Sequence, residues 1–308
     1  MRTIKLIILI WLLAAIVAAV FGKVTIAAES SLSTAGFLRV GVGAKAMGLG
    51  EAFTAVADDA SAIYWNPAGL GRFDKRQLQF SHYDWYQDVK IENLYCAFPS
   101  GRFGFGAGIT YLGFGKFQSY DEDGNQGDEL TMYNLAASVS VGYALNENLS
   151  IGVTGKYIEQ SFDIVKGTAF AGDIGLLADL NSVRFGLAAV NLGAPVRFVS
   201  QEEQLPSAVR LGIALRQFSD KMMVSAEAYV PFEGDIVWHQ GVELNLAKQL
   251  YARTGFTYQP QDVPGADAFR YNLGAGIAYG AGRFDYTFIP SSQFGGDPIH
   301  NLSLSLTW

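Results

Sequence analysis

Eight charged residues occur in segments whose other side chains are mostly apolar, small or uncharged. They are Lys156, Asp173, Arg210, Glu227, Glu243, Arg253, Arg270 and Asp285. Opposite charges fall on neighbouring segments, which permits the pairs Lys156–Asp173, Arg210–Glu227, Glu243–Arg253 and Arg270–Asp285. In a shared interior, such pairs either form a structural network that anchors another part of the chain or line a polar passage for a solute.

Other candidate sites fail on spacing. Gly104, Gly106 and Gly108 lie inside an alternating segment and complete no phosphate-binding loop. The three histidines lie on distant segments without a neighbouring ligand pair. Residues 121–125 resemble the start of a calcium loop, but Met132 stands where the twelfth-position glutamate belongs. The sequence therefore predicts a protein that is not an enzyme and that has neither a cofactor nor a metal site.

The charged segments belong to a series that alternates with period two. In residues 298–308 the leucines and Trp308 occupy every second position, with Ser or Thr between them. Period two is the signature of a strand, and in a membrane barrel it separates a lipid face from a lumen face. About fourteen such segments follow residue 72: 76–86, 89–98, 101–116, 130–144, 148–162, 168–180, 182–193, 206–217, 221–231, 235–247, 249–259, 268–280, 282–290 and 298–308.

The composition agrees with a membrane barrel. Charged residues make up 17% of the chain, against about 25% in typical soluble domains, and there are 35 glycines. Past residue 28, no apolar run approaches the roughly eighteen residues that a membrane helix needs. The formal net charge of −7, with no Lys/Arg cluster, argues against nucleic acid as a partner. The single cysteine, Cys96, excludes an internal disulfide.

The connections between these segments sort by length. The short ones, such as residues 99–100 and 145–147, alternate with longer ones, such as 117–129 and 194–205. Short turns at one rim and long loops at the other are typical of bacterial outer-membrane barrels. We therefore predict a transmembrane antiparallel β-barrel of about fourteen strands in the outer membrane of a Gram-negative bacterium, with both termini periplasmic.

Two segments precede the barrel. Residues 1–28 have a basic start and an apolar run, as in an export signal. Residues 29–72 are rich in glycine and alanine; we expect a plug here, with a short helix within 52–64 and a turn at Asn66-Pro67. The predicted organisation is a signal peptide (1–28), a plug (29–72) and a barrel (73–308).

The wording MGLGEAFTAVADDASAIYWNPAGL, residues 47–70, resembles the N-terminal plug of outer-membrane barrels of the PorV/PorQ family, and more distantly the hatch of FadL-type fatty-acid channels. The first resemblance implies a role in protein secretion or surface attachment, with secretion-system components or secreted cargo as partners. The second implies passage of hydrophobic small molecules through the barrel wall beside the plug. A structural barrel is the third alternative. The motif residues that carry over are Asp58, Asp59, Asn66 and Pro67.

Two further expectations concern contacts and assembly. The carboxylates of Asp58 and Asp59 are expected near the lumen cations Arg210, Arg253 or Arg270, where they would hold the plug. The C-terminal residue Trp308 follows alternating leucines, which resembles the signal that the barrel-assembly machinery reads in outer-membrane barrels. Outer-membrane lipid is the remaining expected partner.

Overall fold

The computed structural model describes residues 34–86, 89–120, 123, 125–163, 165–198, 202–217, 221–260, 268–290 and 298–308. The predicted signal peptide, residues 1–28, lies outside the described residues. The N-terminus, which we expect to be periplasmic, lies outside them as well. Within the described residues, no helix is both long and apolar enough to cross a membrane.

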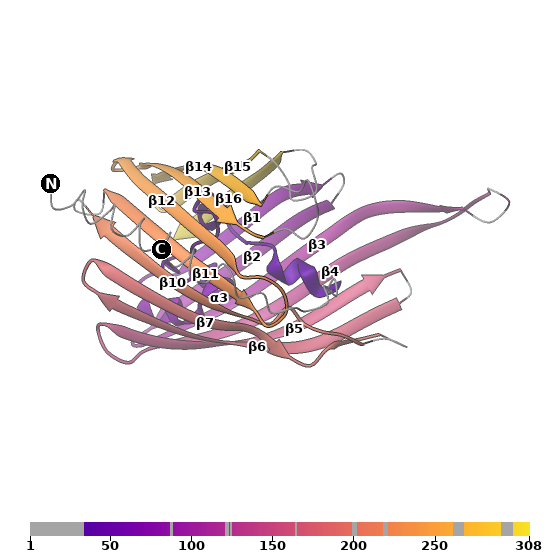
Figure 1. The fold of residues 1–308 in the computed structure, drawn as a ribbon, viewed down its shortest axis with the longest axis horizontal. Coiled ribbons are helices and arrows are strands. Elements are labelled where there is room, and N and C mark those ends of the chain that lie inside the picture. The colour runs from indigo at the N-terminus through magenta and orange to yellow at the C-terminus, as the bar shows by residue number, and fades with distance from the viewer. Residues whose placement is uncertain are drawn as a thin grey trace.

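Fourteen antiparallel strands form a closed barrel (Figure 1). Each pairs with its neighbours in chain order, β7 pairs with β10, and β1 pairs with β16 to close the ring. The strands are β1 Gln77–Tyr86, β2 Val89–Ser100, β3 Phe103–Tyr120, β4 Gln126–Ala144, β5 Leu149–Phe162, β6 Val165–Leu180, β7 Val183–Gly193, β10 Ala208–Gln217, β11 Met222–Pro231, β12 Val237–Ala247, β13 Leu250–Tyr258, β14 Phe269–Tyr279, β15 Gly282–Ile289 and β16 Ile299–Thr307.

The predicted strands are confirmed, with two differences at their ends. Strands β3 and β4 are longer than their neighbours. Pairing of β3 with β2 ends at Gly113, and pairing of β4 with β5 begins at Met132. Beyond these residues, β3 and β4 pair only with each other and project from the barrel as a two-stranded ribbon (Figure 1). The expected loop 194–205 contains two two-residue strands, β8 Val196–Arg197 and β9 Glu202–Glu203. We call the barrel end with Gln77 and Thr307 the short-turn end and the opposite one the long-loop end.

The barrel has an apolar outside and a polar inside. Outward side chains include Val139, Phe170 and Tyr279, which are 67%, 71% and 80% exposed. Neutral polar and charged residues on the alternate positions are buried. A soluble protein would reverse this arrangement, whereas a barrel in lipid needs it, because a closed ring satisfies every backbone group and leaves the apolar face to the hydrocarbon.

Strands β1 and β2 alternate poorly in the sequence because apolar residues point inward as well as outward. Ile91 and Tyr95 of β2 are buried, and so is Tyr83 of β1. Burial still alternates along β2, with Leu94 and Phe98 on the outside. The inward apolar residues face the plug, so the buried side here is itself partly hydrophobic.

Residues 34–72 lie inside the barrel. Their elements are the 3-10 helix η1 Thr34–Arg39, the helices α2 Ala44–Gly48 and α3 Ala62–Trp65, and the 3-10 helix η2 Pro67–Arg72. The expected helix within 52–64 is therefore confined to its last residues. Positive φ at Ala57 (32°) and the turn in which Asp59 accepts from the Ser61 N–H keep the preceding stretch out of helical geometry.

Inward glycines bring the plug backbone directly onto the barrel wall. At Gly255 an added Cβ would stand 2.5 Å from the Cα of Gly50, and at Gly241 it would stand 2.5 Å from the carbonyl oxygen of Leu49. No side chain fits at such distances. Similar contacts surround the plug on eight strands, at Gly104, Gly142, Gly152, Gly175, Gly186, Gly212, Gly241 and Gly255. The high glycine content thus serves a close fit between wall and plug.

This fit predicts that Gly255→Val prevents the plug from seating and destabilises the folded barrel by at least about 1–3 kcal/mol, the usual cost of overpacking. Gly155→Val is the matched control, since a Cβ at Gly155 meets only a Val139 methyl at 4.0 Å on the outer face. The gel shift between unboiled and boiled samples, after refolding in a urea series, measures the folded fraction. Equal midpoints for the two variants would contradict the fit.

Candidate functional site

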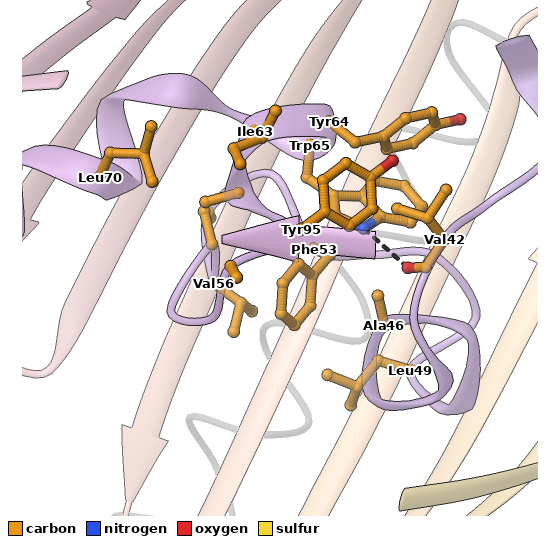
Figure 2. Packing of buried hydrophobic residues seen from close by; sticks show 14 of the residues in the cluster. Val42, Ala46, Leu49, Phe53, Val56, Ile63, Tyr64, Trp65, Leu70 and Tyr95 are labelled. Atoms are coloured by element: carbon orange, nitrogen blue, oxygen red, sulfur yellow. Dashed lines mark hydrogen bonds between the residues drawn. The ribbon is translucent and has the colours of Figure 1, made fainter. Parts of the chain in front are cut away.

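The centre of the plug is a small apolar core around Trp65. Phe53 and Tyr64 pack edge-on against Trp65, with ring centroids 6.0 and 4.9 Å away. The indole N–H of Trp65 donates to the carbonyl oxygen of Val42 at 3.1 Å, and Tyr95 reaches the same cluster from β2 (Figure 2). One aromatic cluster therefore joins plug segments that are distant in sequence and ties them to the wall.

Asn66 and Pro67 form the turn between α3 and η2 of the plug. Helix α3 ends at Trp65 because Asn66, the residue before proline, is extended (φ −163°). The Asn66 amide donates to the carbonyl oxygens of Thr54 at 2.9 Å and of Leu176 in β6 at 3.1 Å, while its own oxygen accepts from the Ala68 N–H. One buried side chain thus caps η2, closes a plug loop and attaches that loop to the wall.

Asp58 and Asp59 lie elsewhere than expected. Asp58 pairs with Lys45 of the plug at 2.6 Å, and Asp59 accepts hydrogen bonds from Ser61. The expectation that lumen cations hold them is wrong, because the plug supplies its own cation. Burial raises the pKa of Asp58, but the Lys45 ammonium outweighs burial and lowers that pKa to about 2. Burial raises the pKa of Asp59.

The structure places the eight lumen charges on the inner face. Three of the four expected pairs are in contact: Lys156–Asp173 at 2.7 Å, Arg210–Glu227 at 2.8 Å and Arg253–Glu243 at 2.6 Å. The fourth pair, Arg270–Asp285, is not. Asp285 instead pairs with Arg253 and Arg283, both at 2.7 Å, and Arg270 makes no ion pair with a described carboxylate. The expectation failed because of the strand register: Gly276 lies opposite Asp285, and Arg270 is six residues further along β14.

Glu227 connects the lumen charges to the plug. One carboxylate oxygen accepts from Arg210, and the other accepts from the backbone N–H groups of Phe53 and Thr54 at 3.1 and 2.9 Å. The Arg210 guanidinium in turn lies 4.7 Å from the Trp65 ring and 4.8 Å from the Tyr229 ring. Both charges are buried and both are compensated. This arrangement fixes the middle of the plug to β10 and β11.

Neutral side chains of the barrel hold the rest of the plug by its backbone. Asn272 donates to the Met47 carbonyl at 2.5 Å, Ser303 accepts from the Ala44 N–H at 2.7 Å, and Gln79 accepts from the Ser61 N–H at 3.0 Å. Thr257, Thr287 and Gln77 make similar contacts. These residues were not predicted from the sequence, because that prediction rested on charged side chains. Their signal was a neutral polar side chain on the inward face of an alternating strand.

Toward the long-loop end, residues of η1 and α2 cover a largely apolar part of the inner face, which also contains the hydrogen-bonded pair Asn134–Gln160. Inward residues there include Tyr83, Ile91, Leu112 and Ile158, all at most 1% exposed. Phe37 and Leu38 of η1 and Met47 of α2 pack among them in one cluster, which Ala136, Ala169, Ala171, Val196, Leu205, Ile289 and Ile299 complete. We call this set the mouth cluster. It contrasts with the charged and hydrogen-bonding surface that surrounds the plug.

The wall itself is irregular at one place beside the plug. The register between β6 and β7 shifts between Gly172 and Ile174, and the β7–β10 ladder ends at Val190. Asn191, with a positive φ of 57°, donates its backbone N–H to the Asp173 carboxylate at 2.8 Å, and Lys156 contacts both side chains. Here three side chains, which we call the wall knot, replace part of the backbone ladder.

A closed antiparallel barrel with an apolar outer face, a polar interior and an internal plug defines the chain as a plugged barrel of the outer-membrane type. More particularly, the chain belongs to the Uncharacterised protein family (UPF0164), whose family model matches residues 15–260. Two UPF0164 proteins of Treponema pallidum (strain Nichols) are 26% and 28% identical to it over 191 and 187 residues. Each match covers 54% of this chain and 45% of the relative, so the chain spans about half the length of these relatives.

Solved structures with the same architecture include the Pseudomonas putida toluene transporter TodX (TM-score 0.61, 14% identity) and the CymD monoaromatic hydrocarbon channel (TM-score 0.62, 15% identity). Each alignment covers 87% of this chain and 97% of the other. At such identities the likeness establishes the fold alone. The plugged-barrel architecture expected from the sequence is supported by this likeness. The family model that matches is that of UPF0164, and the comparisons do not show the PorV/PorQ family.

The Lys45–Asp58 pair gives the plug a pH dependence. The pKa of Asp58 is lower in the folded protein, about 2, than in the unfolded chain, about 4. The ionised carboxylate therefore stabilises the folded state above about pH 4, and this contribution is lost as the pH falls toward 2. We therefore expect the plug to loosen in that window. Trp65 fluorescence, taken as the difference from a Trp65→Phe variant, measures it. In Asp58→Asn the plug should already be loosened at pH 6, and the Trp65 fluorescence should not change further as the pH falls. A wild-type pH profile in Asp58→Asn would show that the Lys45–Asp58 pair is not the cause.

Because Glu227 links Arg210 to the plug backbone, we expect the substitution Glu227→Gln to destabilise the folded barrel strongly. Glu227→Gln leaves the buried Arg210 without its anion, which typically costs about 3–5 kcal/mol. Glu202→Gln breaks the exposed Arg197–Glu202 pair, at 3.1 Å, and should cost at most about 1 kcal/mol. Urea unfolding in detergent compares the two variants. A Glu227→Gln midpoint as close to wild type as that of Glu202→Gln would show that the ion pair does not hold the plug.

Proposed function

We propose that this barrel carries hydrophobic small molecules across the outer membrane. The observation that supports this most directly is the mouth cluster, an apolar part of the inner face at the long-loop end that residues of η1 and α2 cover in this structure. A hydrophilic solute gains nothing from such a surface. An apolar solute is favoured there by about 25 cal/mol for each Å² of surface that leaves water.

The route lies beside the plug and not through it. The plug backbone touches the wall at glycines on eight strands, and barrel side chains hold its N–H and C=O groups. An apolar molecule would have to break this polar layer to move along the axis. The wall knot adjoins the mouth cluster through Ala169 and Ala171 of β6, which precede Asp173 on the same face of the strand. Sideways exit into the lipid at the wall knot avoids the polar layer.

The fold comparisons favour this proposal over protein export. TodX is described as a toluene transporter and CymD as a monoaromatic hydrocarbon channel, and both share the architecture. Export rests on the resemblance of residues 47–70 to the PorV/PorQ plug, and the family and structure comparisons give it no support.

Filling the mouth cluster should therefore slow transport. Ala136→Trp places an indole inside the cluster, whereas Ala137→Trp places it on the outer face of the same strand, where it meets lipid. We expect uptake of labelled toluene by intact Gram-negative cells that carry the barrel in their outer membrane to fall several-fold for Ala136→Trp and to stay at the wild-type rate for Ala137→Trp, with both proteins heat-modifiable. Equal uptake by the two folded variants would refute a hydrophobic route through the mouth and leave the structural role.

A further inference from the structure

The two ends of the barrel carry opposite charge. Exposed cations collect at the short-turn end: Lys75, Arg76, Arg102, Arg216, Lys221 and Lys248. Among the described residues, the exposed carboxylates at that end are Asp74 and Glu147. Exposed carboxylates dominate toward the long-loop end, with Asp84, Glu92, Asp128, Glu129, Asp163, Glu202 and Glu233. A chain with a formal net charge of −7 thus keeps a positive rim at one end only.

The positive rim borders the apolar outer face at the short-turn end. Arg76 exchanges backbone hydrogen bonds with Trp308 at 3.0 and 3.1 Å, and Trp308 is 56% exposed. Arg102 directly precedes Phe103, whose ring packs 4.7 Å from that of Tyr143 on the outer face. Aromatic residues mark the membrane–water boundary of transmembrane barrels, so these cations lie at the depth of the lipid headgroups.

The rim cations are also not neutralised within the described part of the chain. Arg76, Arg102, Lys221 and Lys248 make no ion pair with a described carboxylate. Toward the opposite end, Lys166 pairs with Glu159 and Arg197 pairs with Glu202, both at 3.1 Å. The positive charge at the short-turn end is therefore available to an external anion.

We propose that the short-turn rim binds the headgroups of anionic phospholipids in the adjoining leaflet. Guanidinium and ammonium groups suit a phosphodiester, and the lipid tails of the same molecules cover the neighbouring aromatic residues. The acidic long-loop end repels such headgroups, so the charge distribution selects one leaflet. This inference is independent of the proposed transport function, since it concerns only the outer surface of the rim.

Native mass spectrometry of the purified full-length barrel, given equal amounts of phosphatidylglycerol and phosphatidylcholine in detergent, tests the proposal. Wild type should retain phosphatidylglycerol preferentially, and 0.5 M ammonium acetate should reduce the preference. The triple variant Arg76→Gln, Arg102→Gln, Lys248→Gln should weaken phosphatidylglycerol retention by about a hundredfold, since each rim cation contributes about fivefold.

The matched control removes the same charge from the other end, with Lys90→Gln, Lys166→Gln and Arg197→Gln. It should retain phosphatidylglycerol as wild type does. Both triple variants must show the wild-type gel shift on boiling; single Arg102→Gln, in a turn, serves if the rim triple does not fold. Equal retention of the two lipids by wild type, or equal loss in both triple variants, would overturn the proposal. Unchanged retention in a folded rim variant would also overturn it and would leave the rim to an acidic protein.

Discussion

A buried, loop-rich plug must find partners for its backbone groups, and this need shapes much of the barrel interior. The helices of residues 34–72 are too short to satisfy their own N–H and C=O groups. Barrel side chains supply the missing partners. Glu227 does so with a charge that Arg210 compensates, and Asn272, Ser303 and Gln79 do so without charge. The polar side chains of the inner face are therefore placed to hydrogen-bond one particular backbone conformation of the plug.

This arrangement divides the lumen into two environments. Around the plug, the inner face offers hydrogen bonds that the plug already uses. Toward the long-loop end, the inner face is largely apolar and packs against side chains of the plug that include Phe37, Leu38 and Met47. The boundary between the two is where the wall departs from a regular ladder at Asp173 and Asn191. A molecule held in the apolar part thus meets a polar floor and an irregular side wall.

Period-two alternation and the turn residues were sufficient to predict the barrel, because lipid and lumen impose opposite requirements on successive residues. The ion pairs Lys156–Asp173 and Arg210–Glu227 followed from the same alternation, since neighbours in chain order are neighbours in the barrel. The plug was harder to predict. Its backbone follows wall contacts more than local propensity, so the sequence did not reveal the short α3, the Lys45–Asp58 pair or the glycine contacts. Arg270 shows the remaining limit: alternation gives the face on which a residue lies, whereas the register that sets Gly276 and not Arg270 opposite Asp285 is not readable from it.

The glycine contacts have a consequence for how the molecule folds. The plug precedes β1 in the chain, and its backbone meets the wall at glycines on eight strands. The seam between β1 and β16, from Gln77–Thr307 to Asp84–His300, encloses this segment. The contacts that seat the plug are therefore complete only when the ring is closed, which links the two parts of the fold in one cooperative unit.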